Sequence, residues 1–430
     1  MLKVVLVNTF ESYGGAAIAA NRLISALKKH EVDAKLLVRN KQSDNSDVIP
    51  FNTSFFSKVL SFLLFSFERF KILMHNKLSK NNLFAISIAN TGNDISKSKI
   101  IKEADIIHIH WINQGFLSLR DLEKLTTLRK PIVWTMHDQW PYTGICHYTG
   151  GCSKYTDTCS YCPMLENSKK ADLSYKTFEK KIYIYKSNTI TLVGCSRWIA
   201  DEAKKSKLCY NTNIFSIPNP IDITRYNKRD KIENRKYFNL PSDKKLILFG
   251  ACNVTDKRKG FDYMKASCDL LCDQKKLSQE DVIIVVFGGK TNEIENLLPY
   301  NIYDIGYIRD EQSMIRLYNA VDLFLIPSLE DNLPNTIMEA MSCGTPCVGF
   351  NTGGIPEMID HLHNGYIAEY KNAEDLAKGI CWVLNEADYE DISSKAREKA
   401  VNNYSEDIIA RQYIELYKSV LKNHMQIINY

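Results

Sequence analysis

Short apolar runs alternate with stretches of helical spacing through the first half of the chain. Each run holds five or six residues, and such short apolar segments are typical of strands buried on both faces of a sheet. Between them, apolar positions recur every three or four residues, as in helices that cover a sheet. The predicted strands are 3–8, 34–38, 105–110, 132–136 and 189–194, and the predicted helices are 16–27, 118–128 and one beginning at Arg197.

The same alternation restarts in the second half, after a segment at 217–243 that is rich in charges and contains prolines. We expect a linker and domain boundary in that segment. The later predicted strands are 246–250, 282–287, 323–326 and 347–350, and the later helices are 260–271, 311–320, 334–342, 373–384 and 407–421. The pattern predicts an α/β protein of two Rossmann-like, doubly wound domains, with a ligand cleft at the carboxyl ends of their strands.

The amino-acid composition limits the class of protein further. The chain has 430 residues, too many for one ordinary core, and its 45% hydrophobic and 24% charged residues are typical of a soluble globular protein. A net charge of +5 is too small for a dedicated nucleic-acid binder. Residues 1–7 are interpreted as a strand, not a signal peptide, and no apolar run reaches the length of a membrane span. We therefore expect a cytoplasmic protein with reduced cysteines.

Glycines and basic residues follow several predicted strands. Gly14 and Gly15 lie between the first strand and the first helix, and Gly353-Gly354 precedes another helical segment. Such glycines let the backbone approach a phosphate, although a tight turn alone also requires them. The basic run 257–260, KRKG, is another loop between a strand and a helix. It is either a solvated loop or a set of cations for a diphosphate leaving group.

The segment 328–346, SLEDNLPNTIMEAMSCGTP, combines acidic residues with a helix start. Pro334 suits the first helical turn and Gly344 suits the helix end. Glu339 lies among apolar neighbours, where a buried carboxylate needs a hydrogen-bond donor. Ribose or sugar hydroxyls are suitable donors, and the alternative is a solvated helix glutamate.

These segments together resemble glycosyltransferase family 4, a family of retaining enzymes with GT-B architecture. The resemblance runs nearly end to end and is densest over 306–365. The amino-terminal half is similar to bacterial colanic-acid and other surface-polysaccharide transferases, through ADIIHIHWINQGFLSL and WTMHDQWPYTGICHYTGGC. The resemblance implies a domain at 1–220, joined by the helix 405–430, that binds the acceptor. It implies a second domain at 221–404 that binds the nucleotide sugar.

The resemblance also implies site roles. Asp331, with Glu330 beside it, contacts the donor sugar, and Glu339 holds the ribose hydroxyls. Lys259 binds the donor diphosphate, and His137 lines the sugar pocket from the first domain. The donor-binding set is completed by Gly14, Gly15, Arg258, Tyr307, Ile308, Arg309, Asn332 and Leu333.

Two positions depart from the family pattern. The family usually has arginine directly after the glycine that ends the strand before the lysine, and here Ala251 follows Gly250. Either Arg258 substitutes for it or the diphosphate is held more weakly. The first acidic position is commonly glutamate, and Asp331 is one methylene shorter.

The function that the resemblance implies is retaining, metal-independent transfer of a sugar from a nucleotide-sugar donor, with a UDP- or GDP-sugar expected. The acceptor would be a glycan, expected on undecaprenyl diphosphate, in the assembly of O-antigen, capsule or exopolysaccharide. One alternative is a catalytically inactive GT-B scaffold that binds a partner glycosyltransferase. A zinc-dependent nucleic-acid binder is a weaker alternative, because the chain lacks a clustered basic face.

Four cysteines, Cys146, Cys152, Cys159 and Cys162, lie within seventeen residues. In a cytosolic chain this spacing suggests a structural zinc site, with His147 as a further candidate ligand. The alternative is four reduced thiols in a packed loop.

The segment 55–78, FFSKVLSFLLFSFERFKILMHNKL, is both apolar and basic. Its longest uncharged stretch, 59–67, is too short to span a bilayer. It is interpreted either as a helix on an anionic membrane surface or as a helix packed on the first sheet.

Overall fold

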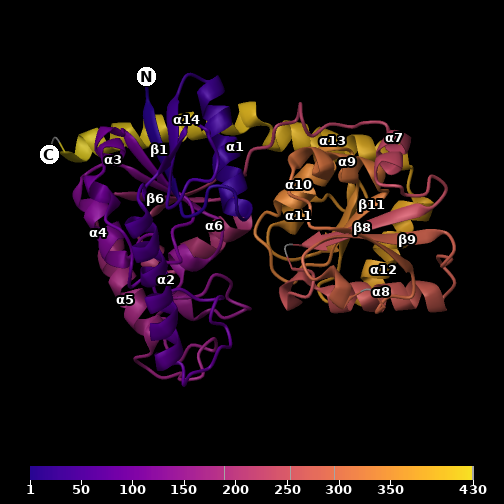
Figure 1. Cartoon of the computed structure of the whole chain (residues 1–430), viewed down its shortest axis with the longest axis horizontal. Coiled ribbons are helices and arrows are strands. Elements are labelled where there is room, and N and C mark those ends of the chain that lie inside the picture. Colours follow the sequence, from indigo (N-terminus) through magenta and orange to yellow (C-terminus); the bar gives the residue numbers. More distant parts are fainter. Residues whose placement is uncertain (188, 252, 295, 429–430) are drawn as a thin grey trace. The chain divides into compact units, whose positions relative to one another are not determined.

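The computed structural model describes residues 1–187, 189–251, 253–294 and 296–428. The chain divides into two compact units (Figure 1). Unit 1 consists of Met1–Pro220 together with Ile409–Tyr430, and unit 2 consists of Ile221–Ile408. The last two residues of the helix expected at 405–430 lie outside the described residues.

Unit 1 is built on a seven-stranded parallel sheet in the order β3-β2-β1-β4-β5-β6-β7. The strands are β1 (Lys3–Asn8), β2 (Asp33–Val38), β3 (Val48–Pro50), β4 (Ile106–Ile109), β5 (Ile132–Met136), β6 (Ile190–Gly194) and β7 (Asn213–Ser216). The helices are α1 (Gly15–Lys29), α2 (Phe55–His75), α3 (Lys99–Glu103), α4 (Leu119–Thr127), α5 (Leu173–Tyr185), α6 (Arg197–Lys204) and α14 (Glu406–Ile428).

The sheet of unit 1 is buried on both faces. Val4 and Leu6 of β1 belong to a core formed with α1 and α14, whereas Val5 and Val7 belong to a core formed with α3, α4, α5 and α6. Side chains alternate between the faces of a strand, so a nearly continuous apolar run serves both cores. The predicted return of the C-terminal helix to the first sheet is confirmed.

Unit 2 is built on a six-stranded parallel sheet in the order β10-β9-β8-β11-β12-β13. The strands are β8 (Lys245–Ala251), β9 (Val282–Gly288), β10 (Asn301–Gly306), β11 (Leu323–Ile326), β12 (Cys347–Phe350) and β13 (Gly365–Ala368). The helices are α7 (Lys231–Tyr237), α8 (Phe261–Asp273), α9 (Glu311–Ala320), α10 (Asn335–Ser342), α11 (Ile355–Met358), α12 (Ala373–Cys381) and α13 (Tyr389–Tyr404). Helices α8 and α12 cover one face of this sheet, and α9 and α10 lie on the other (Figure 1).

The segment expected as a linker, 217–243, is not irregular throughout, because it contains α7. The Arg235 side chain of α7 is buried, and it pairs with Asp322 through Nη2 at 2.7 Å and donates Nε–H to the Ala320 carbonyl. These polar contacts hold α7 on unit 2. The charged residues of α7 are typical of a linker, but they form a helix that packs on unit 2. Among the described residues, no helix is long and apolar enough to cross a membrane.

Candidate active site

The basic loop and the acidic loop of unit 2 meet at the carboxyl edge of its sheet. Strands β8 and β11 are neighbours, and the chain runs outward from this pair in both directions, which makes it the topological switch point. Lys259 follows β8 and Asp331 follows β11. Lys259 Nζ donates to Asp331 Oδ2 at 2.6 Å. The two predicted residues, 72 apart in sequence, are thus brought into direct contact.

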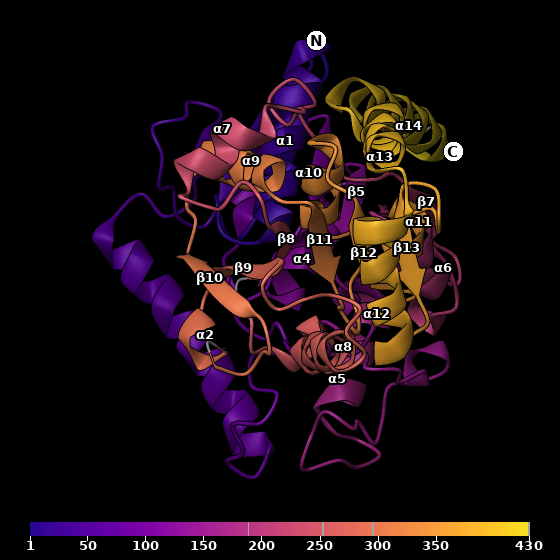
Figure 2. The ribbon, with the colours of Figure 1, turned by 90° about the vertical axis from the view of Figure 1, so that its right-hand side faces the viewer.

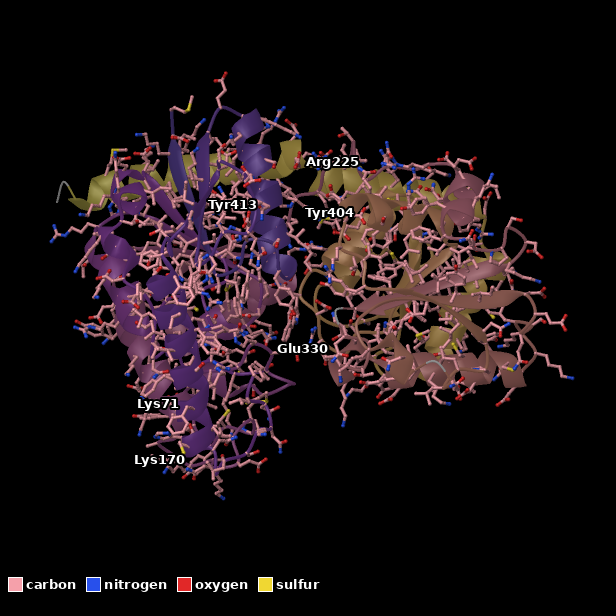
Figure 3. The ribbon with its side chains drawn as sticks, in the orientation of Figure 1. Lys71, Lys170, Arg225, Glu330, Tyr404 and Tyr413 are labelled. Atoms are coloured by element: carbon pink, nitrogen blue, oxygen red, sulfur yellow. The ribbon has the colours of Figure 1, made fainter. Side chains whose placement is uncertain are left out.

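Two cations surround the Asp331 carboxylate. Arg258 Nη1 lies 3.6 Å from Asp331 Oδ2 and donates to the Glu330 carbonyl at 2.8 Å. Burial alone would raise the pKa of Asp331, but the charges of Lys259 and Arg258 and the hydrogen bond from Lys259 hold this pKa below its usual value. Asp331 is therefore a carboxylate at neutral pH. Glu330, labelled in Figure 3, lies on the same loop.

Two glycines allow these loops to approach closely. Gly260 has φ +71°, and a Cβ there would lie 1.8 Å from the Pro327 carbonyl oxygen. Gly353 has φ +59°, and a Cβ there would lie 1.8 Å from the carbonyl oxygen of Asp331. Gly354 N donates to that same oxygen at 3.1 Å. The predicted glycine pair therefore supports the backbone that carries Asp331.

Glu339 lies on α10 and is buried, as its apolar neighbours suggested. Its Oε2 accepts a hydrogen bond from the Tyr318 hydroxyl at 3.0 Å. Burial, together with the charge of Glu339, raises the pKa of Tyr318 well above its ordinary value. Tyr318 was missed from the sequence, because nothing in its local pattern connects the end of α9 with a residue on α10.

The remaining predicted donor residues of unit 2 occupy two places. Tyr307, Ile308 and Arg309 follow β10 and line an open depression of about 500 Å³. Asn332 and Leu333 are buried in the loop that leads to α10. The backbone N–H of Asn332 donates to Asp331 Oδ1 at 3.2 Å.

In unit 1, the predicted Gly14-Gly15 turn begins α1. Gly14 is the N-cap with φ +87°, and a Cβ there would meet no atom within 4 Å. The glycine is needed for its backbone angle and not for space. Helix α1 has no acidic residue in its first turn.

A histidine cluster lies at the carboxyl edge of the unit 1 sheet. His110 follows β4 and His137 follows β5, which is the neighbouring strand. His110 Nδ1 lies 2.8 Å from His137 Nε2, and the two rings stack with centroids 5.1 Å apart. His137 Nδ1 lies 3.5 Å from Cys195 Sγ. His137 was predicted, whereas His110 was not, although it lies within the HIHW segment.

These imidazoles are neutral at pH 7. Burial lowers the pKa of His137 to about 4, although the charge of Asp138 acts in the opposite direction. Burial, and then His137, lower the pKa of His108 to about 3. His108 bonds Tyr417 of α14 and Thr135 through its two ring nitrogens, each at 2.7 Å. The imidazoles at this edge of the unit 1 sheet are therefore neutral, whereas the cluster in unit 2 is built from cations and a carboxylate.

His147, considered above as a further metal ligand, belongs to another network. Its Nδ1 lies 2.6 Å from Asp138 Oδ2, and its Nε2 lies 3.0 Å from Ser87 Oγ. Trp111 Nε1 also donates to Asp138 Oδ2 at 2.8 Å. Ser87 is 1% exposed, so substrates cannot reach this acid–histidine–serine chain. Its hydrogen bonds instead hold the segments around Ser87, Trp111 and Asp138 together.

The four cysteines expected to bind zinc line one small cavity together. However, among the described residues no group of three or more His, Cys, Asp or Glu side chains is placed to hold a metal ion. Burial raises the pKa of the Cys146 and Cys159 thiols to about 12 and that of Cys162 to about 11, whereas Cys152 is half-buried. The structure therefore favours the alternative of four thiols packed in a loop, and the zinc site stays a prediction.

The two parts of the chain match two family descriptions. Residues 13–225 match the family described as Glycosyltransferase Family 4, and residues 230–402 match Glycosyl transferases group 1.

Two curated relatives match parts of the chain. An uncharacterized glycosyltransferase of Haemophilus influenzae is 30% identical over 236 residues, covering 54% of this chain and 60% of that protein. The N,N'-diacetylbacillosaminyl-diphospho-undecaprenol alpha-1,3-N-acetylgalactosaminyltransferase of Campylobacter jejuni is 31% identical over 208 residues, covering 45% and 53%. The chain thus spans little more than half the length of these relatives.

The Anabaena protein HepE, solved with UDP and glucose, has a TM-score of 0.62 at 15% identity, covering 97% of this chain and all of that one. This likeness shows the fold, which is that of the GT-B glycosyltransferases. Because both parts match and the fold agrees, the chain belongs to Glycosyltransferase Family 4, and its second part is a group 1 glycosyl transferase domain.

Proposed function

We propose that this glycosyltransferase moves a sugar from a nucleotide-sugar donor to a glycan acceptor with retention of anomeric configuration and without a catalytic metal. The Lys259–Asp331–Arg258 cluster at the switch point of the unit 2 sheet carries this proposal. When the bond between the sugar and the diphosphate breaks, negative charge develops on the departing phosphate. Two cations fixed by a buried carboxylate are suited to stabilise that charge.

We propose that Arg258 takes the role of the family arginine, which is replaced by Ala251 in this chain. Arg258 and Lys259 contact the same carboxylate, so both cations are present at one point. Asp331, with its charge already balanced, is suited to accept hydrogen bonds from sugar hydroxyls and not to attack the anomeric carbon. Glu330, Asn332 and Leu333 continue this donor-binding loop.

We propose a UDP- or GDP-sugar as the donor, and the nucleotide bound by HepE supports this class. Glu339, held by the Tyr318 hydroxyl, would bind the ribose hydroxyls. Tyr307, Ile308 and Arg309, beside the depression after β10, would contact the base. Gly14 and Gly15 at the start of α1 would cover the diphosphate.

We propose that unit 1 binds the acceptor, a glycan on undecaprenyl diphosphate, in the cytoplasmic assembly of a bacterial surface polysaccharide. The undecaprenol-linked substrate named for the Campylobacter relative supports this acceptor class. The neutral His137, near His110, would line the sugar pocket. A neutral imidazole donates or accepts a hydrogen bond to a hydroxyl without adding charge.

The test is a screen of the purified chain against UDP-, GDP-, dTDP- and CMP-sugars, with and without EDTA. Thermal shift and release of free nucleotide are followed together. A selective shift with EDTA-resistant nucleotide release is the expected result. With a lipid-linked acceptor, the one-bond C1–H1 coupling of the product distinguishes retention from inversion.

Nucleotide-sugar binding without turnover on any acceptor would favour the inactive-scaffold alternative. Release of nucleotide that EDTA abolishes would contradict the metal-independent mechanism. An absence of any shift, from folded protein, would contradict the donor assignment itself.

A further inference from the structure

Helix α2 is attached to unit 1 by its polar side. Only Ser61, Glu68, Arg69 and Ile72 of its 21 residues are buried. Glu68 Oε1 accepts hydrogen bonds from the Ile88 and Ala89 amides at 2.9 and 2.8 Å. Arg69 pairs with Glu68 at 2.9 Å and donates to the Ile86 carbonyl. The helix is thus held by an ion pair and by backbone groups, beside a small apolar contact.

The opposite side of α2 is apolar and exposed. Phe56, Leu63, Phe67, Phe70 and Met74 are spaced by seven, four, three and four residues, which places them on one helical face. Phe56 is 83% exposed and the other four are each more than half exposed. Figure 2 shows α2 at the periphery of unit 1. The alternative in which the apolar residues of this helix pack on the first sheet is therefore wrong.

This arrangement reverses the usual orientation of a surface helix. Surface helices of globular proteins turn their apolar stripe toward the core and their charges toward water. Large exposed apolar patches on folded chains mark surfaces that bind a partner or a membrane. The polar anchoring of α2 keeps its apolar stripe outward, so the orientation is built into the packing.

The charges around the stripe indicate which occupant covers it. Between Phe55 and Lys80 the single acidic residue is Glu68, which is buried in its ion pair with Arg69. The basic side chains Lys58, Lys77 and Lys80 are exposed, and Lys71 is half-buried on α2 (Figure 3). An apolar stripe within a segment whose exposed charges are all positive is complementary to a lipid surface that carries anionic headgroups.

We propose that α2 docks the protein on an anionic membrane, with the helix parallel to the surface and the Phe56–Met74 stripe inserted among the headgroups. A helix of 21 residues is about 31 Å long, so the stripe offers several aromatic anchors in a row. This docking does not depend on sugar transfer. It deepens the proposed function, because it brings unit 1 to the surface where a lipid-linked acceptor resides.

The test uses the full chain and vesicles of phosphatidylcholine, with or without about one quarter phosphatidylglycerol. Co-sedimentation is expected with the anionic vesicles and is expected to weaken as salt is raised. The triple variant Phe56→Gln, Leu63→Gln, Phe67→Gln keeps helix propensity and should lower partitioning about 1,000-fold, at roughly tenfold per inserted side chain. A matched triple, Tyr210→Gln, Phe215→Gln, Ile232→Gln, removes exposed apolar groups elsewhere and should change partitioning less than about twofold.

Two double charge-reversal variants distinguish electrostatic attraction to anionic lipid from nonspecific apolar adsorption. Lys71→Glu with Lys77→Glu should lower partitioning at least about tenfold, whereas Lys275→Glu with Lys276→Glu, of equal charge change, should have little effect. Circular dichroism and nucleotide-sugar hydrolysis confirm folding, so lost docking with retained hydrolysis is distinct from failure of the proposed function.

Three results would overturn the proposal. The first is no binding of the unmodified protein to anionic vesicles, and the second is undiminished binding by the Phe56–Leu63–Phe67 triple variant. The third is a dimer in sedimentation velocity that this triple converts to a monomer without any vesicle binding. That last result would assign the stripe to a second copy of the chain.

Discussion

In unit 2 the carboxyl edge of the sheet holds two cations around a carboxylate, whereas in unit 1 the same edge holds the imidazoles of His110 and His137, which are neutral at pH 7. Both sheets are parallel and both clusters follow neighbouring strands. The backbone therefore specifies where a site forms, and the loop residues specify its charge. Paired cations suit a diphosphate, and neutral imidazoles suit sugar hydroxyls.

The largest effect that tests this contrast is expected from Lys259→Ala. Loss of this cation should lower kcat/KM by about 10²- to 10³-fold, because charge on the leaving diphosphate is no longer stabilised. Lys257→Ala removes an exposed lysine of the same basic loop and serves as the control. A drop of less than about tenfold for Lys259→Ala would contradict the role of the ionic edge.

Tyr318→Phe probes the support of Glu339 in unit 2. It removes the hydroxyl that donates to a buried carboxylate, so the free energy of unfolding should fall by about 1–3 kcal/mol. Urea unfolding measures the change, with Tyr210→Phe as an exposed control. An unchanged unfolding midpoint would show that the hydroxyl does not support Glu339.

The neutral histidines of unit 1 predict a stability that falls with acid. The pKa of His108 is lowered to about 3, below the unfolded value near 6.5. The unfolded state therefore binds more protons between these values, and stability is lost as pH falls below about 6.5. Between pH 7 and 5, His108 should contribute a loss of about 2 kcal/mol.

Urea unfolding at pH 7 and pH 5, followed by tryptophan fluorescence, measures this loss. Trp111, Trp134, Trp140 and Trp198 lie in unit 1 and Trp382 lies in unit 2, so the signal reports mainly on unit 1. His108→Gln should reduce the difference between the two pH values. An equal difference in both proteins would mean that His108 is not held neutral.

The smallest effect is expected from Gly14→Ala. The positive φ of Gly14, with open space beside it, should cost about 1 kcal/mol of stability. Gly151 has the same φ of +87° and is equally open, so Gly151→Ala should cost a similar amount. Only Gly14→Ala should raise the KM for the nucleotide sugar. Equal KM values would leave Gly14 with a purely conformational role.

The predictability of the elements follows their burial. Strands β5, β11 and β12 were predicted with their observed bounds, because continuous apolar runs mark strands buried on both faces. Strands β7 and β10 were missed because none of their residues is buried, so their sequences resemble loops. Helix α7 was missed because its many charged residues are typical of a linker, although one of them, Arg235, is buried.

The site was predictable where local motifs carry it and unpredictable where distant segments meet. The strand–loop–helix segments around Lys259 and Asp331 were recognised from their residues. The hydrogen bond from Tyr318 to Glu339 and the His110–His137 pair depend on tertiary contacts that no local pattern records. The cysteine spacing suggested a metal, but spacing alone does not fix where sulfur atoms point.

The hydroxyls of Tyr413 and Tyr417 have a consequence for biosynthesis. The hydroxyl of Tyr413, labelled in Figure 3, bonds Thr135, and that of Tyr417 bonds His108, so both residues of α14 reach the unit 1 sheet. A ribosome has made all of residues 1–220 and the whole of unit 2 before it reaches them. The core of unit 1 thus lacks these contacts until α14 has been made, whereas unit 2 ends at Ile408. Unit 1 accordingly cannot complete its core before all of unit 2 has been synthesised, so the order of synthesis does not set the order in which the two cores are completed.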